Sequence, residues 1–188
     1  MRKRVTELLN CLDATRTRLL ATVRGVNPAV AEIQPADGAW SAAQIVAHLA
    51  IVEASVARLV ERSVAWAREN GVGPESSDDS VLGNLESSTF ATSRQKIQAP
   101  EAMAPPTDAK MEIVLKSLET SRVALRKALV EGDGLDLSAV KRPHRILGEL
   151  NVYEWVLFVA HHEQRHTRQI DETIKAVCAD AVQTVPIV

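Results

Sequence analysis

Apolar residues recur every three or four positions in four long stretches of this chain, the spacing that places them on one face of an α-helix. The first stretch runs from near the N-terminus to about Gly25, and we expect the others to cover 41–69, 108–131 and 151–180. No stretch shows the strict apolar–polar alternation of a half-buried strand. Four amphipathic helices of similar length bury their apolar faces best against one another. The sequence therefore predicts an all-α protein, a four-helix bundle.

Two of the predicted helices have a clear start signal. Ser41 is followed three residues later by Gln44, which is the pattern of a capping box, where each side chain binds the other residue's backbone N–H. Asn151 and Glu154 repeat this arrangement at the start of the last helix. The third helix follows a pair of prolines, and we expect residues 107–108 to supply its cap.

A long crossover, residues 71–107, joins the second and third predicted helices and is rich in Ser, Asp, Pro and Gly. Within it, residues 82–98 have room for a short helix around Phe90 and Ile97. A crossover of this length can connect two parallel neighbours, so a simple up-down-up-down topology is not assumed. We find no internal repeat and predict one domain spanning residues 1–188.

Charge and composition exclude several classes of protein. The 22 Lys and Arg residues nearly balance the 24 Asp and Glu residues, a net charge of −2, so we expect no nucleic-acid partner and no anionic membrane partner. Gly-rich nucleotide-binding motifs are absent. The longest purely apolar run, residues 155–160, is too short to span a bilayer, and no signal-peptide pattern opens the chain. Cys11 and Cys178 lie far apart in predicted helices, which favours reduced thiols in a cytoplasmic protein.

Three of the five histidines have a pattern that suits a metal ion. His162 and His166 stand four residues apart in the last predicted helix and so share one face. His48 lies on or beside the apolar stripe of the second helix and is expected to point inward. Imidazole is a common ligand of zinc, nickel, copper and iron. The alternative is that these are hydrogen-bonded core histidines. Because two imidazoles in an apolar stripe need a partner, we favour a metal site.

Three segments carry a resemblance to a known family: Trp-Ser-Ala-Ala-Gln-Ile-Val-Ala-His-Leu at 40–49, Gly-Glu-Leu-Asn-Val-Tyr-Glu-Trp at 148–155 and His-Glu-Gln-Arg-His-Thr-Arg-Gln-Ile at 162–170. Together they resemble the two signatures of the DinB-like superfamily. The resemblance implies a four-helix bundle, a divalent transition metal (zinc, nickel or iron) held by His48, His162 and His166, and usually a homodimer. Similar proteins include thiol-dependent S-transferases that use bacillithiol or mycothiol, isomerases, and proteins assigned as metal-dependent hydrolases.

Three functions are compatible with a site of three histidines, which leaves at least one coordination position open. The leading hypothesis is a metal-dependent enzyme that transfers a low-molecular-weight thiol to an electrophilic small molecule. A second is a hydrolase that uses metal-bound hydroxide and needs no thiol. A third is a metal-stabilised binding or stress-response module without turnover, which the lack of an evident general base favours.

Other polar residues near the predicted ligands are expected to serve different roles. Glu163 directly follows His162 and points about 100° away along the helix, so we interpret it as a solvated or interface carboxylate and not as a general base. His161 is expected at an interface or the surface for the same reason. His144 follows a proline in the preceding loop, where exposure to solvent is favoured over lining the pocket.

The remaining residues singled out are explained by local structure. Trp40 is expected to pack at the start of the second helix, and capping accounts for Gln44, although it is close enough to His48 to line a pocket. Two alternatives stay open for Arg165 and Arg168. They are solvated charges, or they pair with carboxylates of the last helix or of a partner chain.

Overall fold

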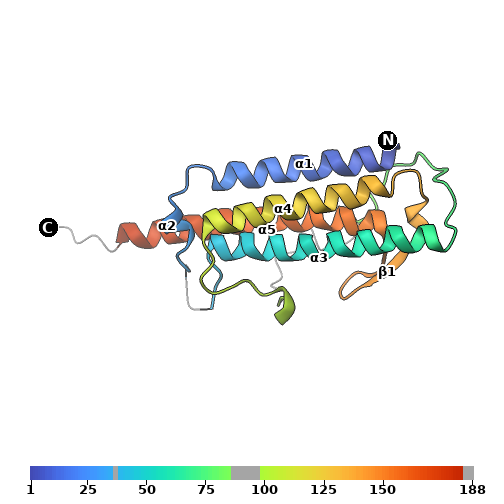
Figure 1. Ribbon diagram of the computed structural model, residues 1–188. Coiled ribbons are helices and arrows are strands. Elements are labelled where there is room, and N and C mark those ends of the chain that lie inside the picture. Colours follow the sequence, from blue (N-terminus) through green and yellow to red (C-terminus); the bar gives the residue numbers. More distant parts are fainter. Residues whose placement is uncertain (36–37, 86–97, 184–188) are drawn as a thin grey trace.

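The computed structural model describes residues 1–35, 38–85 and 98–183. Four long helices dominate it and lie side by side as a bundle (Figure 1). Their bounds are α1 (Lys3–Val23), α3 (Ala42–Glu69), α4 (Met111–Glu131) and α5 (Val152–Gln183). This arrangement confirms the predicted all-α class and the four-helix bundle.

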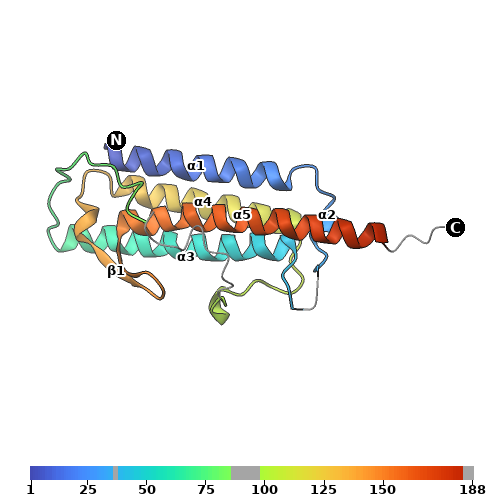
Figure 2. The ribbon, with the colours of Figure 1, turned by 180° about the vertical axis from the view of Figure 1, so that it is seen from behind.

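The helices run in two parallel pairs. α1 and α5 run in one direction, and α3 and α4 run in the other (Figures 1 and 2). α3 packs along α4, α1 packs along α5, and α3 also contacts α5. The connection between α3 and α4 must therefore return along the bundle, as the long crossover predicted. The short helix expected around Phe90 and Ile97 falls on 86–97, outside the described residues.

Both predicted capping boxes are present. The backbone N–H of Gln44 donates to Ser41 Oγ (3.2 Å), and that of Ser41 donates to Gln44 Oε1 (2.9 Å). At the start of α5, the N–H of Glu154 donates to Asn151 Oδ1 (3.0 Å), and that of Asn151 donates to Glu154 Oε2 (2.9 Å). These caps fix where the two histidine-bearing helices begin.

The start of α4 differs from the prediction. The helix begins at Met111, after the expected cap at 107–108, and its N-cap Lys110 makes no side-chain capping bond. Glu32, from a distant part of the chain, accepts from the N–H of Met111 instead (3.3 Å) and pairs with Lys110 (2.8 Å). A cap supplied from outside the helix leaves no local sequence pattern.

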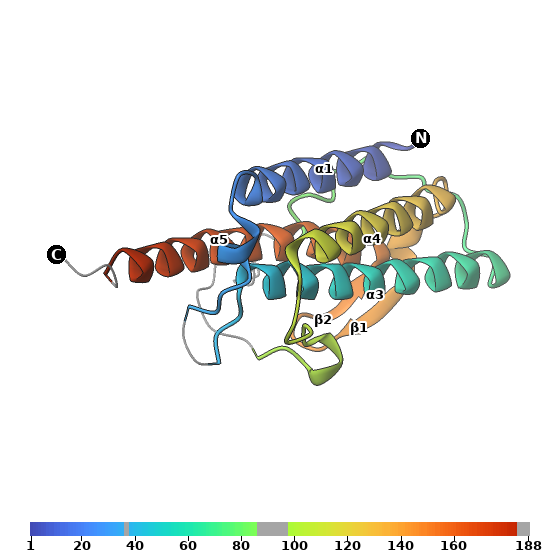
Figure 3. The same cartoon turned by 60° about the vertical axis from the view of Figure 1, so that its left-hand side comes forward.

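The fold also contains a minor two-stranded sheet that the sequence analysis did not predict. A short hairpin, β1 (Lys141–His144) paired antiparallel with β2 (Gly148–Asn151), precedes α5. Four-residue strands are too short to show alternation, and a proline in β1 argues against a strand in the sequence. The hairpin lies on the same side of the bundle as the 3₁₀ turn η1 (Glu101–Met103) of the crossover (Figure 3). Two further short elements are α2 (Pro28–Ala31) and η2 (Leu137–Ala139).

The apolar core consists of two clusters at different levels of the bundle. One includes Leu12, Val56, Leu125 and Ala160, and the other includes Leu19, Ala50, Leu118 and Ile170. On each long helix, the members of the two clusters are separated by a few residues. That intervening level carries buried charged side chains, which are described below.

Helix α3 is apolar and long enough to cross a membrane by length and composition alone. However, 67% of its apolar window is buried inside the bundle, as expected of a core helix. Its composition is therefore explained by packing against the other helices. Cys11 is half-buried, Cys178 is exposed, and both are free thiols.

Candidate metal centre

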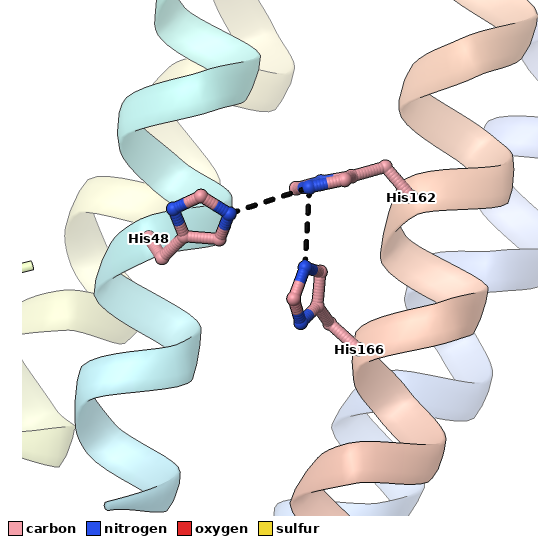
Figure 4. A group of neighbouring side chains, drawn as sticks. All are labelled: His48, His162 and His166. Carbon is pink, nitrogen blue, oxygen red and sulfur yellow. Dashed lines mark hydrogen bonds between the residues drawn. The ribbon is translucent and has the colours of Figure 1, made fainter. Parts of the chain in front are cut away.

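Three histidines from two helices point at one another inside the bundle (Figure 4). Nε2 of His162 lies 3.3 Å from Nε2 of His48 and 3.2 Å from Nε2 of His166. Potential ligand atoms of all three lie within 4.8 Å of one another, as one metal ion would require. The structure thus brings together the three residues singled out from the sequence.

The outer ring nitrogens of two of these histidines are held by hydrogen bonds. Nδ1 of His48 lies 2.7 Å from the carbonyl oxygen of Met103, and Nδ1 of His166 lies 2.7 Å from Oε1 of Gln169. Because these oxygens only accept, each Nδ1 carries the proton. In the neutral ring, Nε2 then presents its lone pair toward the cluster, which is the form that binds a metal.

The protons available do not satisfy this cluster. Nε2 of His162 faces two lone pairs, those of His48 and His166, and a neutral imidazole can supply it with at most one proton. At least one of the two short contacts therefore has no hydrogen between its nitrogens. A cation at the centre removes the conflict. The observed separations also match the roughly 3.3 Å between ligand nitrogens of a tetrahedral ion with bonds of about 2.0–2.1 Å.

The surroundings keep all three rings neutral. Burial, with help from the other two histidines, holds the pKa of His162 well below its usual value. Burial and the neighbouring His48 lower the pKa of His166 to about 3. Burial also lowers the pKa of His48, against the opposing effect of the Met103 carbonyl. A metal ion binding near neutral pH would therefore meet neutral imidazoles and would not have to displace the second proton of an imidazolium.

Aromatic rings surround the cluster. The ring of Trp40 lies 5.0 Å from that of His48, and the ring of Phe158 lies 5.3 Å from that of His162. Trp40 thus packs at the start of α3, as predicted, and against a candidate ligand as well. His48 and His162 are buried, whereas His166 is half-buried.

His144 lies in the hairpin and not in an exposed loop, so the preferred interpretation of it was wrong. Its ring is half-buried and lies 4.6 Å from Phe158 and 5.0 Å from Trp155. Its Nδ1 accepts from the backbone N–H groups of Ile146 (3.2 Å) and Leu147 (3.1 Å). One aromatic ring, Phe158, therefore connects His144 with the candidate ligand His162. Strand β1, which the sequence analysis did not predict, places His144 against Phe158.

Glu163 is buried and not solvated, which corrects the prediction. Only 2% of its surface is exposed, and its carboxylate pairs with Arg16 (2.6 Å) and Arg122 (2.9 Å). The helical geometry was right, because the side chain does point away from the cluster. The sequence did not reveal that Arg16 of α1 and Arg122 of α4 lie next to this carboxylate. Its exclusion as a general base is consistent with these pairings.

The other residues singled out occupy the following places. Gln44 serves as the predicted cap and also accepts from Gln34 (3.0 Å). His161 and Arg165 are half-buried and Arg168 is exposed. Pairing of these residues with a second chain remains a prediction.

The fold and the site define a helical bundle with an internal three-histidine cluster. The chain belongs to the DinB superfamily, whose family model matches residues 11–170. It is 23% identical to the uncharacterised protein YuaE of Bacillus subtilis (strain 168) over 168 residues, which covers 87% of this chain and 95% of YuaE. A solved structure, TT2238, described as a four-helix bundle protein, matches with a TM-score of 0.61 and 24% identity over 89% of this chain and 98% of that one. That match supports the fold.

Proposed function

We propose that this protein binds one divalent transition metal ion through Nε2 of His48, His162 and His166, and that it is a metal-dependent enzyme. The observation that carries the proposal is the convergence of three Nε2 atoms with too few protons to satisfy them. Membership in the DinB superfamily supports it. Zinc, nickel and iron(II) all suit three imidazoles, so the choice among them is left to the experiment.

The chain's own residues would hold and shield this centre. The carbonyl of Met103 and the amide of Gln169 orient His48 and His166, and the rings of Trp40 and Phe158 keep water away from two sides. Three protein ligands leave a coordination position for another molecule. When bound there, a divalent ion supplies Lewis acidity, which lowers the pKa of a thiol or a water molecule.

Transfer of a low-molecular-weight thiol to an electrophilic small molecule is the reaction we favour. In this step the thiol loses its proton to solvent and its sulfur forms a bond to the electrophilic carbon. In a substitution the bond to the leaving group breaks and that group departs with the electron pair; in an addition a π bond or ring bond breaks and the atom that takes its electron pair receives a proton from solvent. A free thiol has a pKa of about 8.5, far below the pKa of water, so it ionises with far less help from a general base. Glu163, the carboxylate next to His162, is committed to two arginines and is not free to serve as that base.

The experiment compares protein loaded with zinc, nickel or iron(II) with chelator-treated protein. Consumption of a chlorodinitrobenzene electrophile is measured with cysteine, glutathione, bacillithiol or mycothiol, and with no thiol. We expect turnover that needs both metal and thiol. Turnover of an ester or amide that needs metal but no thiol favours the hydrolase. Metal-dependent thermal stability without turnover of any substrate favours the non-catalytic binding module.

Two further properties expected from the sequence belong to this proposal. We propose that the protein is a homodimer and that it acts in the cytoplasm, where low-molecular-weight thiols are reduced. Light scattering on the purified protein and fractionation of expressing cells test these two points separately.

A further inference from the structure

Four charged side chains, one from each long helix, form a closed ring of alternating sign; Glu53, Arg122 and Glu163 are buried, and the Arg16 side chain is 12% exposed. Arg16 of α1 pairs with Glu163 of α5 (2.6 Å) and with Glu53 of α3 (2.7 Å). Arg122 of α4 pairs with Glu163 (2.9 Å) and also with Glu53. The formal charges cancel. No two members of the ring come from the same helix, so the ring links all four.

Each carboxylate oxygen in this ring has a partner. Glu53 also accepts from the Ser121 hydroxyl (2.8 Å), and Glu163 also accepts from the Thr15 hydroxyl (2.6 Å). The arginines use their remaining donors on backbone carbonyls at Leu118 and Leu12. Burial alone would lower the pKa of Arg122, but Glu163 and Glu53 outweigh it and raise that pKa. Both oxygens of each carboxylate are therefore paired, and the ring lies at the level between the two apolar clusters.

The ring is attached to the two helices that carry the histidines. Glu163 directly follows His162, so the two side chains leave α5 about 100° apart. Glu53 follows His48 by five residues, which separates their directions on α3 by about 140°. On each helix one face carries the cluster and another face is held by the ring. If α3 or α5 rotated about its helix axis, its histidines and its ring glutamate would move together. The contacts of the ring therefore also determine where the histidines of that helix point.

Stability alone explains such a ring poorly. Buried ion pairs are often no more stabilising than apolar residues of similar volume, although removing one partner is costly. What the ring adds is orientation, since each planar arginine bridges two carboxylates that come from two different helices. A histidine Nε2 lies roughly 6.5 Å from its helix axis, so a rotation of about 10° moves it by about 1 Å. Metal–ligand distances tolerate only about ±0.2 Å.

We propose that Glu53 and Glu163 are positioning residues for the three-histidine cluster, acting through the rotation of α3 and α5. This inference rests on the proposed metal binding. The variants that test it are Glu53→Gln and Glu163→Gln, which keep the shape and remove the charge. The matched control is Glu75→Gln, because Glu75 is equally buried and paired with Arg4 (3.0 Å) but follows α3 in the chain and lies outside the ring.

The readouts are the visible absorption spectrum of bound cobalt(II) and its affinity measured by chelator competition. We expect both ring variants to change the spectrum and to lose roughly tenfold or more in affinity, the scale seen for outer-shell residues. The Glu75→Gln control should lose thermal stability and keep the parental spectrum and affinity. Ring variants with the parental spectrum and affinity overturn the inference, and so does a control that changes as much as they do.

If the two Gln variants do not fold, Glu163→Asp decides the question in the same assay. It keeps the charge but shortens the arm by one carbon, so a changed cobalt spectrum supports positioning and an unchanged one overturns it. A parent protein that binds no cobalt overturns the proposed function itself. A parent that binds cobalt while every ring variant binds identically overturns only the positioning role.

Discussion

Nε2 of His48 lies 3.3 Å from Nε2 of His162, although 114 positions separate the two residues in the chain. His48 cannot donate in this contact, because the Met103 carbonyl holds its proton on the other ring nitrogen, and His162 has at most one proton to share between His48 and His166. His166 presents a third nitrogen to the same point. Met103 belongs to the crossover between α3 and α4. The crossover therefore determines which ring nitrogen of His48 carries the proton.

Replacing Gln169 with leucine should weaken metal binding without removing a ligand. Its Oε1 accepts from Nδ1 of His166 and so holds the Nε2 lone pair toward the cluster. Loss of such an outer partner typically lowers metal affinity roughly 10- to 100-fold. Zinc affinity is measured by competition with a chromophoric chelator.

The control for this variant is Gln164→Leu, which changes an exposed glutamine on the same helix. It should bind zinc like the parent. Equal affinities for the Gln169→Leu variant and the parent would show that His166 needs no such orientation.

The metal-free protein should become less stable as the pH falls below about 6.5. The unfolded chain protonates its histidines near that pH, whereas burial holds the pKa of His162 well below it and the pKa of His166 at about 3. The unfolded state therefore binds more protons across this window, and the free energy of unfolding falls with the pH. Urea denaturation at pH 7 and pH 5 measures the difference.

A His166→Gln variant has one fewer buried histidine and should show a shallower fall over the same window. The difference between variant and parent isolates this histidine from carboxylates that titrate at lower pH. If the stability of the metal-free parent is equal at pH 7 and pH 5, the buried histidines are not held neutral in the way described.

Ser41→Ala should destabilise the protein by about 1 kcal/mol, because the hydroxyl accepts from the N–H of Gln44 in the first turn of α3. Chemical denaturation measures the change. Ser41→Asp retains a good capping acceptor and should stay close to the parent. If alanine and aspartate are equivalent at this position, the cap contributes nothing to the stability of the bundle.

Much of the fold was predictable because its signals are local. The capping boxes at Ser41 and Asn151 and the apolar stripes lie within single helices, so periodicity and spacing reveal them. The hairpin and the cap of α4 were missed for the opposite reason. β1 and β2 are only four residues each, and Glu32 reaches Met111 from another part of the chain.

In the site, too, the local features were predicted and the contacts between distant segments were not. His162 and His166 were found from their spacing, and the inward direction of His48 followed from the apolar stripe beside it. Helical geometry also gave the direction of Glu163 correctly, but not what lies in that direction. The arginines that bury it come from α1 and α4, and such contacts between distant segments depend on tertiary packing.

The most direct test of the account is elemental analysis of protein purified without a His tag, beside the variants His48→Ala and His161→Ala. The second variant removes the histidine next to His162 that is not part of the cluster. We predict about one equivalent of transition metal in the parent and in His161→Ala, and a large loss in His48→Ala. The account is contradicted if the parent holds no metal after incubation with zinc, nickel or iron(II), or if His48→Ala holds as much as the parent.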